Sequence, residues 1–384
     1  MSNPTSQRAQ SKGQRALKAC GLWSKSTGHK PRATSLALAL CALLLALCSF
    51  GLAQNQPQTL VQVLRQAYAQ GPSLQSAQAT LQNASIQLEA LKADPSTLVV
   101  ARTSAQQAYD LAKANLEATR LSVMQSVVNA YLGLYEEQQN VELLQAQVAL
   151  NQRNFDVAKA RQSAGNATAL DVARAQTTLD SSKQSLTNAQ TQIPILSAQL
   201  AALLGVGSLG NFTAVAPAAP KNVQVDLAAL NKDLFSRLPS VLQAQQAVDT
   251  AALNVKLYDN DYTPAVSLQA AKTSLVNNQR ALVTAQQNVQ TSLSNAYQTA
   301  QSYYKQISIA QQSVANAQKV VDQDQVALKA GTISALQLQT DQVSLKSAQY
   351  SALQAVDSYW KALAALSVAA GQDFTGLVVA ASAG

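Results

Sequence analysis

The side chains that most often carry out catalysis or bind metal ions, histidine and cysteine, are confined to the N-terminal end of this sequence. The only histidine, His29, and the three cysteines, Cys20, Cys41 and Cys48, all precede residue 54. Ser-His-Asp and Cys-His nucleophilic sites and the usual zinc sites therefore cannot form from the rest of the chain. Only carboxylate or lysine chemistry remains available there.

The carboxylates do not form a recognisable catalytic pattern either. The sequence has no glycine-rich phosphate loop, no G-x-S-x-G, and no pair of carboxylates framed by apolar residues. Asp and Glu are scattered along polar faces of predicted helices, where solvation is their ordinary role. We therefore predict no catalytic residue, no metal ligand and no cofactor site, and we expect a protein that is not an enzyme.

Residues 1–53 have the pattern of a signal peptide. Seven basic residues and no acidic residue precede Ser35, and an uninterrupted apolar run extends from Ser35 to Cys48. The run is too short for a comfortable transmembrane helix, and Gly51 and Ala53 supply small residues at the −3 and −1 positions of a peptidase site. We predict cleavage after Ala53 and export to the cell envelope. The alternative is a retained N-terminal anchor.

The basic character of the chain comes almost entirely from this leader. The whole chain has 28 basic and 20 acidic residues, a net charge of +8, whereas residues 54–384 have 21 and 20, a net charge of +1. Because the excess of positive charge is a targeting feature, nucleic-acid binding loses its main support.

After the leader the sequence is a tandem duplication with an offset of 166 residues. The stretch RQSAGNATALDVARAQ (161–176) aligns with KAGTISALQLQTDQ (329–342), and Gly205 falls on Gly371 without a gap. The duplication predicts a signal peptide at 1–53, a first helical-hairpin repeat at 54–204, a linker at 205–221, a second repeat at 222–374 and a C-terminal tail at 375–384.

The apolar residues of each repeat have the spacing of coiled-coil helices, and the other faces are rich in Gln, Ser, Thr and Asn. Gly165 and Gly331 are the predicted hairpin-tip turns, because glycine takes the positive φ that ends a helix. Each divides its repeat into a descending helix, roughly 101–163 or 272–329, and a returning helix. The 3-4 pattern of the first returning helix follows Val172, Ala175, Leu179, Ser182, Leu186, Ala189, Ile193, Leu196, Leu200 and Leu203.

Pro194 interrupts the returning helix of the first repeat, at the position where the second repeat has Trp360. Proline removes one helical hydrogen bond and clashes with the preceding turn. We predict a helix kink at Pro194 that the second repeat lacks.

Several features together resemble the TolC-like outer-membrane efflux protein family: the signal peptide, the duplicated hairpins, a Pro-Ser opening in each repeat, and the turns AGNATALDVARAQ and AGTISALQLQTDQ. The similarity covers Thr59 to Gln372. It implies an all-α-dominated fold, in which a homotrimer forms a closed twelve-helix α-barrel across the periplasm, although the departures described below lead us to expect at most short β segments in this chain. Such proteins continue as a β-barrel in the outer membrane and work with an inner-membrane transporter and a periplasmic adaptor protein.

The chain departs from the pattern of this family in two places. Segments 92–100 and 259–270 stand where the family inserts membrane-spanning strands, and each is long enough for one short strand only. The family also places an acidic residue six positions after the turn glycine, near the pore mouth. Asp171 keeps that position, whereas the second repeat has Gln337, with Thr340 and Asp341 beside it. These four are the candidate pore-entrance residues, with weaker cation selection expected.

Two functions fit these observations. The first is a periplasm-spanning exit duct for efflux or secretion of small molecules or proteins. The second is a non-conducting helical strut or spacer of the envelope, because polar Gln, Ser and Asn faces suit a solvated coiled coil as well as a water-filled lumen.

Overall fold

The computed structural model describes residues 57–382 apart from 210–211, 225, 227–229 and 231–233. Contacts divide the chain into two compact units, residues 1–53 and 54–384. The predicted signal peptide, its cleavage after Ala53, and all of the histidine and cysteine of the chain lie outside the described residues. The fold described below is that of the second unit.

The first repeat consists of four helices. They are α2 (Leu60–Gln70), α3 (Pro72–Ala93), α4 (Val99–Ser163) and α5 (Ala169–Leu204). Thr59 caps α2 through a reciprocal pair of hydrogen bonds with Gln62. Pro72 occupies the first turn of α3, where a missing N–H leaves no hydrogen bond unmade.

The second repeat reproduces the two main helices of the first. It contains α7 (Pro239–Tyr258), α8 (Ala265–Lys329) and α9 (Ala335–Ala370), followed by the short α10 (Leu377–Ser382). Helices α4 and α8 both have 65 residues, and α5 and α9 both have 36. Each pair begins 166 positions apart, so the predicted all-α fold of duplicated hairpins is confirmed.

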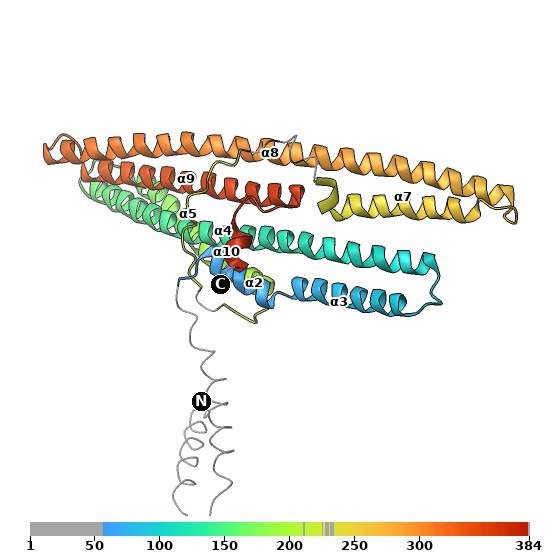
Figure 1. Ribbon diagram of the computed structural model, residues 1–384. Helices are drawn as coiled ribbons and strands as arrows, with labels where there is room; N and C mark the ends of the chain where they lie inside the picture. The colour runs from blue at the N-terminus through green and yellow to red at the C-terminus, as the bar shows by residue number, and fades with distance from the viewer. Residues whose placement is uncertain (1–56, 210–211, 225, 227–229, 231–233, 383–384) are drawn as a thin grey trace, which may run out of the picture. The chain divides into compact units, whose positions relative to one another are not determined.

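Each long helix is accompanied along its length by two shorter ones. Helix α4 packs against α3 and α5, and α8 packs against α7 and α9 (Figure 1). Helix α4 also packs against α7 and α9, and these contacts join the two repeats. At 1.5 Å per residue, each long helix spans roughly 100 Å.

The predicted apolar seam of α5 is the face that lies inside the hairpin. Every one of its ten positions is buried or half-buried, with Leu179 and Leu200 almost fully so. Most of the polar residues between them are exposed. The 3-4 spacing therefore identified the packed face of this helix correctly.

The hydrophobic core lies at the middle of α4 and not along the hairpins. It gathers residues of α2, the segment 121–134 of α4, and the ends of α5 and α9 that are remote from the hairpin tips. Met124, Tyr131 and Tyr359 are fully buried there. Because the core is confined to this region, the outer parts of the hairpins depend on narrow helix-helix seams alone.

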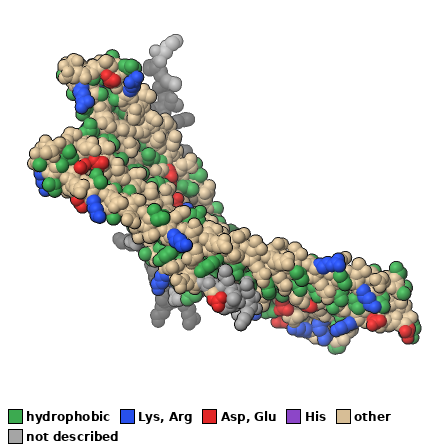
Figure 2. Space-filling view, turned by 90° about the horizontal axis from the view of Figure 1, so that it is seen from above, with side chains coloured by type: hydrophobic (Ala, Val, Ile, Leu, Met, Phe, Trp, Pro, Cys, Tyr) green, Lys and Arg blue, Asp and Glu red, His purple; other side chains and the backbone are tan. Residues whose placement is uncertain are grey.

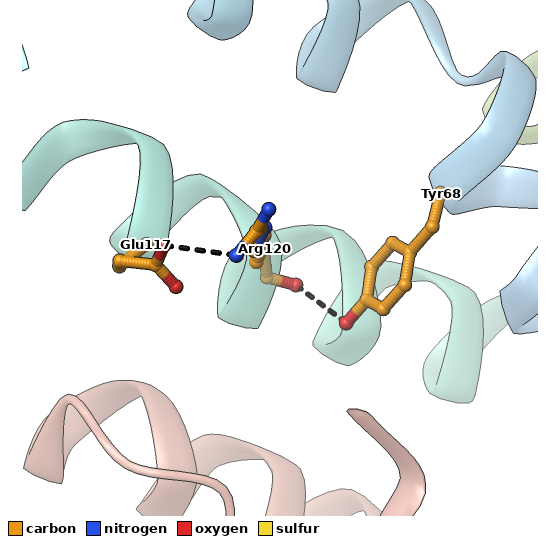
Figure 3. A network of polar contacts seen from close by, with 3 residues as sticks. All are labelled: Tyr68, Glu117 and Arg120. Atoms are coloured by element: carbon orange, nitrogen blue, oxygen red, sulfur yellow. Dashed lines mark hydrogen bonds and ion pairs between the residues drawn. The ribbon is translucent and has the colours of Figure 1, made fainter. Parts of the chain in front are cut away.

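A polar contact fixes the short helix α2 on α4. The Tyr68 hydroxyl of α2 donates to the backbone carbonyl of Arg120 at 3.0 Å, and the Arg120 guanidinium pairs with Glu117 at 2.9 Å (Figure 3). Burial is the main reason why the pKa of Tyr68 is raised, so this hydroxyl remains a donor.

The two segments that were each long enough for one short strand contain none. Helix α3 continues to Ala93 and α4 starts at Val99, while α7 continues to Tyr258 and α8 starts at Ala265. Asp94 closes the first turn by accepting from the Ser96 amide at 2.9 Å, and Asn260 closes the second by accepting from the Tyr262 amide at 2.9 Å. The expected fold with at most short β segments is confirmed, since the helices extend into both segments and tight Asx turns use the few residues left.

Two further features concern the helices themselves. Within the described part of the chain, none of the helices combines the length and the apolar character that crossing a bilayer requires. Pro194 lies inside α5, which remains helical on both sides of it. The kink at Pro194 stays a prediction.

Candidate functional site

The hairpin tips are two turns of the same construction. Gly165 and Gly331 have φ values of 78° and 73°. In the first turn the Asn166 amide donates to the Arg161 carbonyl at 2.8 Å, and in the second the Thr332 amide donates to the Ala327 carbonyl at 3.0 Å. This six-residue closure is a Schellman motif, which uses a left-handed residue to satisfy the last carbonyls of a helix.

Replacing both Gly165 and Gly331 with Val is expected to lower stability by about 1 kcal/mol or more at each site. A Cβ at either position would meet no atom within 4 Å, so the loss arises from the left-handed backbone and not from a clash. Thermal unfolding of the double variant measures it. The matched control is Gly133→Val, a mid-helix glycine that also has open space around it. Unchanged melting and assembly of the double variant would show that the tips tolerate any residue.

Asp171, the first candidate pore-entrance residue, is engaged at the start of α5. Its carboxylate accepts from the Thr168 amide at 2.9 Å and from the Thr168 hydroxyl at 2.7 Å, and the Asp171 amide donates to the same hydroxyl. These hydrogen bonds, first of all the one from the Thr168 backbone, hold the pKa of Asp171 below its usual value. The side chain is therefore an exposed, ionised helix cap.

The second tip uses a different arrangement. Ser334 caps α9 by accepting from the Gln337 amide at 3.1 Å, and the Gln337 side chain donates to Asp341 at 2.7 Å. Thr340 donates to the Leu336 carbonyl of its own helix at 3.0 Å. Of the three candidates in this repeat, only Asp341 offers a negative charge, and Gln337 holds it from the preceding turn.

Asp341 also faces a carboxyl that the sequence analysis missed. It lies at a seam position of α9, and its side chain is the main reason why the pKa of Asp324 on α8 is raised. The sequence signal for Asp324 was its place on the descending helix of the same hairpin, opposite the seam residue Asp341.

The two tips lie at the same end of the unit. Arg153 of α4 donates to the Gln339 side chain of α9 at 2.9 Å, close to both turns. Basic residues accompany the acidic ones here: Arg161 ends α4, Lys329 ends α8, and Arg174 helps to lower the pKa of Asp171. The end therefore carries mixed charge, with Asp171 in the first turn of α5 and Asp341 in the second turn of α9.

A second acidic cluster, also missed by the sequence analysis, is buried between α4 and α9. Asp357 is 1% exposed, and within the described residues neither of its carboxyl oxygens has a hydrogen-bond partner. Lys361, one turn further along α9, pairs with Glu136 of α4 at 2.6 Å. Burial, and then the charge of Glu136, raise the pKa of Asp357 to about 7, and Lys361 opposes them. Asp357 thus titrates near neutral pH.

Neither cluster has the composition of a metal centre. Among the described residues, no group of three or more His, Cys, Asp or Glu side chains is arranged to hold a metal ion. The chemistry that the two clusters offer is charge placement and proton uptake.

Comparison with known proteins gives one family for part of the chain. Residues 94–206 match the family described as outer membrane efflux protein. The fusaric acid resistance protein FusA of Burkholderia cepacia is 27% identical over 173 residues, which cover 44% of this chain and 33% of FusA. The chain therefore spans about a third of the length of the curated relatives it matches.

Solved structures extend the likeness to most of the fold. The outer membrane protein VceC of Vibrio cholerae has a TM-score of 0.59 at 17% identity, covering 82% of this chain and 96% of VceC. The CmeC outer membrane channel of Campylobacter jejuni has a TM-score of 0.60 at 13% identity, covering 82% of this chain and 86% of CmeC. The resemblance to outer-membrane efflux proteins that the sequence predicted is confirmed.

Proposed function

Starting from this likeness to outer-membrane efflux proteins, we propose that the protein is an exit duct that crosses the periplasm for efflux or secretion. The observation that carries the proposal is how little of α8, the long helix of the second hairpin, is buried. Helix α8 has 65 residues and buries four of them: Ala271, Leu293, Ala300 and Val321. A helix of this length that buries so few residues leaves apolar side chains exposed. Helices from other copies of the chain would cover them.

The exposed faces have the composition that such an assembly would use. The face drawn in Figure 2 is mostly uncharged and polar, with hydrophobic side chains scattered through it and few charges. Val283 and Ile309 are exposed on α8 although both are large and apolar. In a homotrimer these side chains would pack between neighbouring hairpins, and the Gln, Ser and Asn faces would line water.

The remaining parts of the proposal come from the family. Three protomers would each supply four long helix segments to a closed α-barrel, with the hairpin tips meeting a periplasmic adaptor protein and an inner-membrane transporter. The other end would lie at the outer membrane. Transported substrates would pass along the axis, and no catalytic step or cofactor is involved.

The alternative is a non-conducting helical strut of the envelope. The turns 94–98 and 259–264 favour it, because neither contains a strand. A strut and a duct differ in one physical property, which is whether the assembled hairpins enclose water.

Replacing Asp171 and Asp341 together with Asn is expected to lower the cation preference of the reconstituted channel. A closed trimer would place up to six of these carboxylates near one axis, and concentrated charge between low-dielectric walls attracts cations and slows anions. Reversal potentials in planar bilayers under a salt gradient measure the preference.

The matched control is Asp110→Asn with Asp249→Asn. Each of these carboxylates accepts from a Gln four residues earlier, as Asp341 does, but both lie on the halves of the repeats remote from the tips. If Asp171 is only a helix cap, the tip variant would lose about 0.3 to 1 kcal/mol of stability and keep its selectivity. That outcome, or a wild type that does not conduct, would refute the prediction that these carboxylates select cations at a pore entrance.

A further inference from the structure

The turns that join α3 to α4 and α7 to α8 expose large apolar side chains. We call residues 94–100 and 257–266 together the turn end. Leu98 is 75% exposed, Tyr262 is 98% exposed and Val266 is 76% exposed. Four more large apolar residues of the turn end are exposed as well: Val99, Val100, Leu257 and Tyr258. Several exposed large apolar side chains within one short turn mark a binding surface more often than an ordinary protein surface.

Both turns belong to one end of the unit. Gln107 of α4 and Gln246 of α7 each donate to the backbone carbonyl of the other, at 3.2 and 2.8 Å, which holds the two helices side by side. From this cross-link the helix rise gives roughly 12 Å to Val99 and roughly 18 Å to Tyr258. The two turns therefore project in the same direction, and the turn after α7 reaches further out, as Figure 1 also shows.

The opposite end of the unit has a different composition. Residues 160–175 and 325–340, which surround the hairpin tips, contain no aromatic residue and are rich in Gly, Ala, Ser and Thr. Leu170 and Val326 are the large apolar residues exposed among the described side chains of those two stretches. The accumulation of exposed Tyr, Leu and Val thus belongs to the turn end and not to hairpin turns in general.

Charge does not distinguish the turn end. The turn end itself contains Asp94, Asp259 and Asp261 and no basic residue, and Lys92, Arg102 and Lys256 lie within two residues of its bounds. Counted over residues 92–102 and 256–266, the charges therefore balance. A surface with balanced charge does not select a highly charged partner such as nucleic acid or a polyacidic peptide. Apolar insertion, with tyrosine and lysine at its margin, is the interaction that this composition provides.

The shape of the turn end decides between a protein and a lipid partner. A stable protein–protein interface buries about 1,000 Å² or more. Two separate turns that each expose three or four apolar side chains offer little continuous area to a folded partner. A bilayer surface can contact every projecting turn at once, and its interfacial region favours Tyr beside aliphatic side chains.

We infer that the turn end binds the interfacial region of a phospholipid bilayer, with Leu98, Tyr262 and Val266 reaching into the boundary between headgroups and acyl chains. Because the charges balance, this binding persists in high salt. The inference uses the envelope location of the proposed function, but it does not depend on conduction. In this inference the two turns themselves make the contact with the membrane.

A fluorescent probe at residue 262 tests the inference directly. All native cysteines lie at positions 20, 41 and 48, so Cys→Ser changes there leave Tyr262→Cys as a unique labelling site in the full chain. The protein is mixed with phosphatidylethanolamine–phosphatidylglycerol vesicles whose acyl chains carry bromine. We expect a blue shift and quenching of a probe at residue 262, and neither at Leu170→Cys, the 58% exposed control at the opposite end.

A charge variant supplies the second readout. Leu98→Asp combined with Tyr262→Asp and Val266→Asp should reduce vesicle partitioning at least about tenfold, since each change removes apolar area from the contact and adds a charge. Leu170→Asp with Val326→Asp should not. All five positions are exposed, so helix content by circular dichroism should stay unchanged in both variants.

Two results would overturn the inference. One is a probe at residue 262 that is unquenched, or quenched no more than the probe at residue 170. The other is a blue shift that needs no vesicles and grows with protein concentration, because a second copy of the chain would then cover the turn end. A hollow, conducting trimer with an unquenched probe would refute this inference alone, whereas a quenched probe without conduction would refute only the duct.

Discussion

Asp357→Asn is expected to stabilise the protein at pH 8 by on the order of 2 to 4 kcal/mol and to leave its stability unchanged near pH 4. The pKa of Asp357 is raised from 3.8 to about 7 by burial and by Glu136, against the opposing charge of Lys361. The contribution of the protonated carboxyl is therefore fully present below pH 4 and is lost as the pH rises through about 7. Asn is neutral throughout this range.

The groups around Asp357 restrict what else could produce this result. Glu136 and Tyr135 face it from α4, and Lys361 and Tyr350 lie on its own helix. Urea unfolding at several pH values, taken as the difference between variant and wild type, isolates the titration of residue 357. Asp249→Asn, an exposed carboxylate of α7, should give a flat difference. A difference for Asp357→Asn that is equally flat would refute a buried, neutral carboxyl.

Tyr131→Ala is expected to destabilise the protein by about 3 to 5 kcal/mol, because the ring is fully buried in the core. Its hydroxyl accepts from the Val215 amide at 2.8 Å and lies 2.7 Å from both the Gln58 and Val215 carbonyls, either of which it can donate to. Tyr131→Phe removes only these hydrogen bonds and should lose about 1 to 3 kcal/mol. Chemical unfolding measures both variants.

The duplication provides the control for this prediction. Tyr297 occupies the same place in the second repeat but is only half-buried. Tyr297→Phe should therefore change stability by less than about 0.5 kcal/mol. Equal losses for the two Phe variants would show that the hydroxyl of Tyr131 does not anchor the chain after α5.

The helices and their packed faces could be predicted because their causes are local. The offset of 166 residues, the 3-4 spacing after each tip and the turn glycines are properties of the sequence itself. The expected descending helices were too short at their starts. The starts of α4 and α8 lie early because an Asx turn at Asp94 or Asn260 needs only a few residues. Comparison with the family, which inserts strands at these places, suggested later starts.

The two carboxyl clusters could not be predicted because their causes are not local. Asp357 corresponds to Thr191 in the first repeat, and Lys361 corresponds to Ile195, so the duplication gives no sign of the cluster. Burial of Asp357 depends on α4 and α9, which belong to different repeats. Likewise, Asp324 matters only because α8 places it against Asp341.

End-on images of the purified, assembled protein by electron microscopy test the duct most directly. A duct requires helices from several copies around a water-filled axis, which the single chain cannot provide. For a duct we expect a hollow ring with threefold symmetry, in which each third contains two hairpins. A solid bundle, or a thin rod made of one copy, would contradict it and would favour the strut.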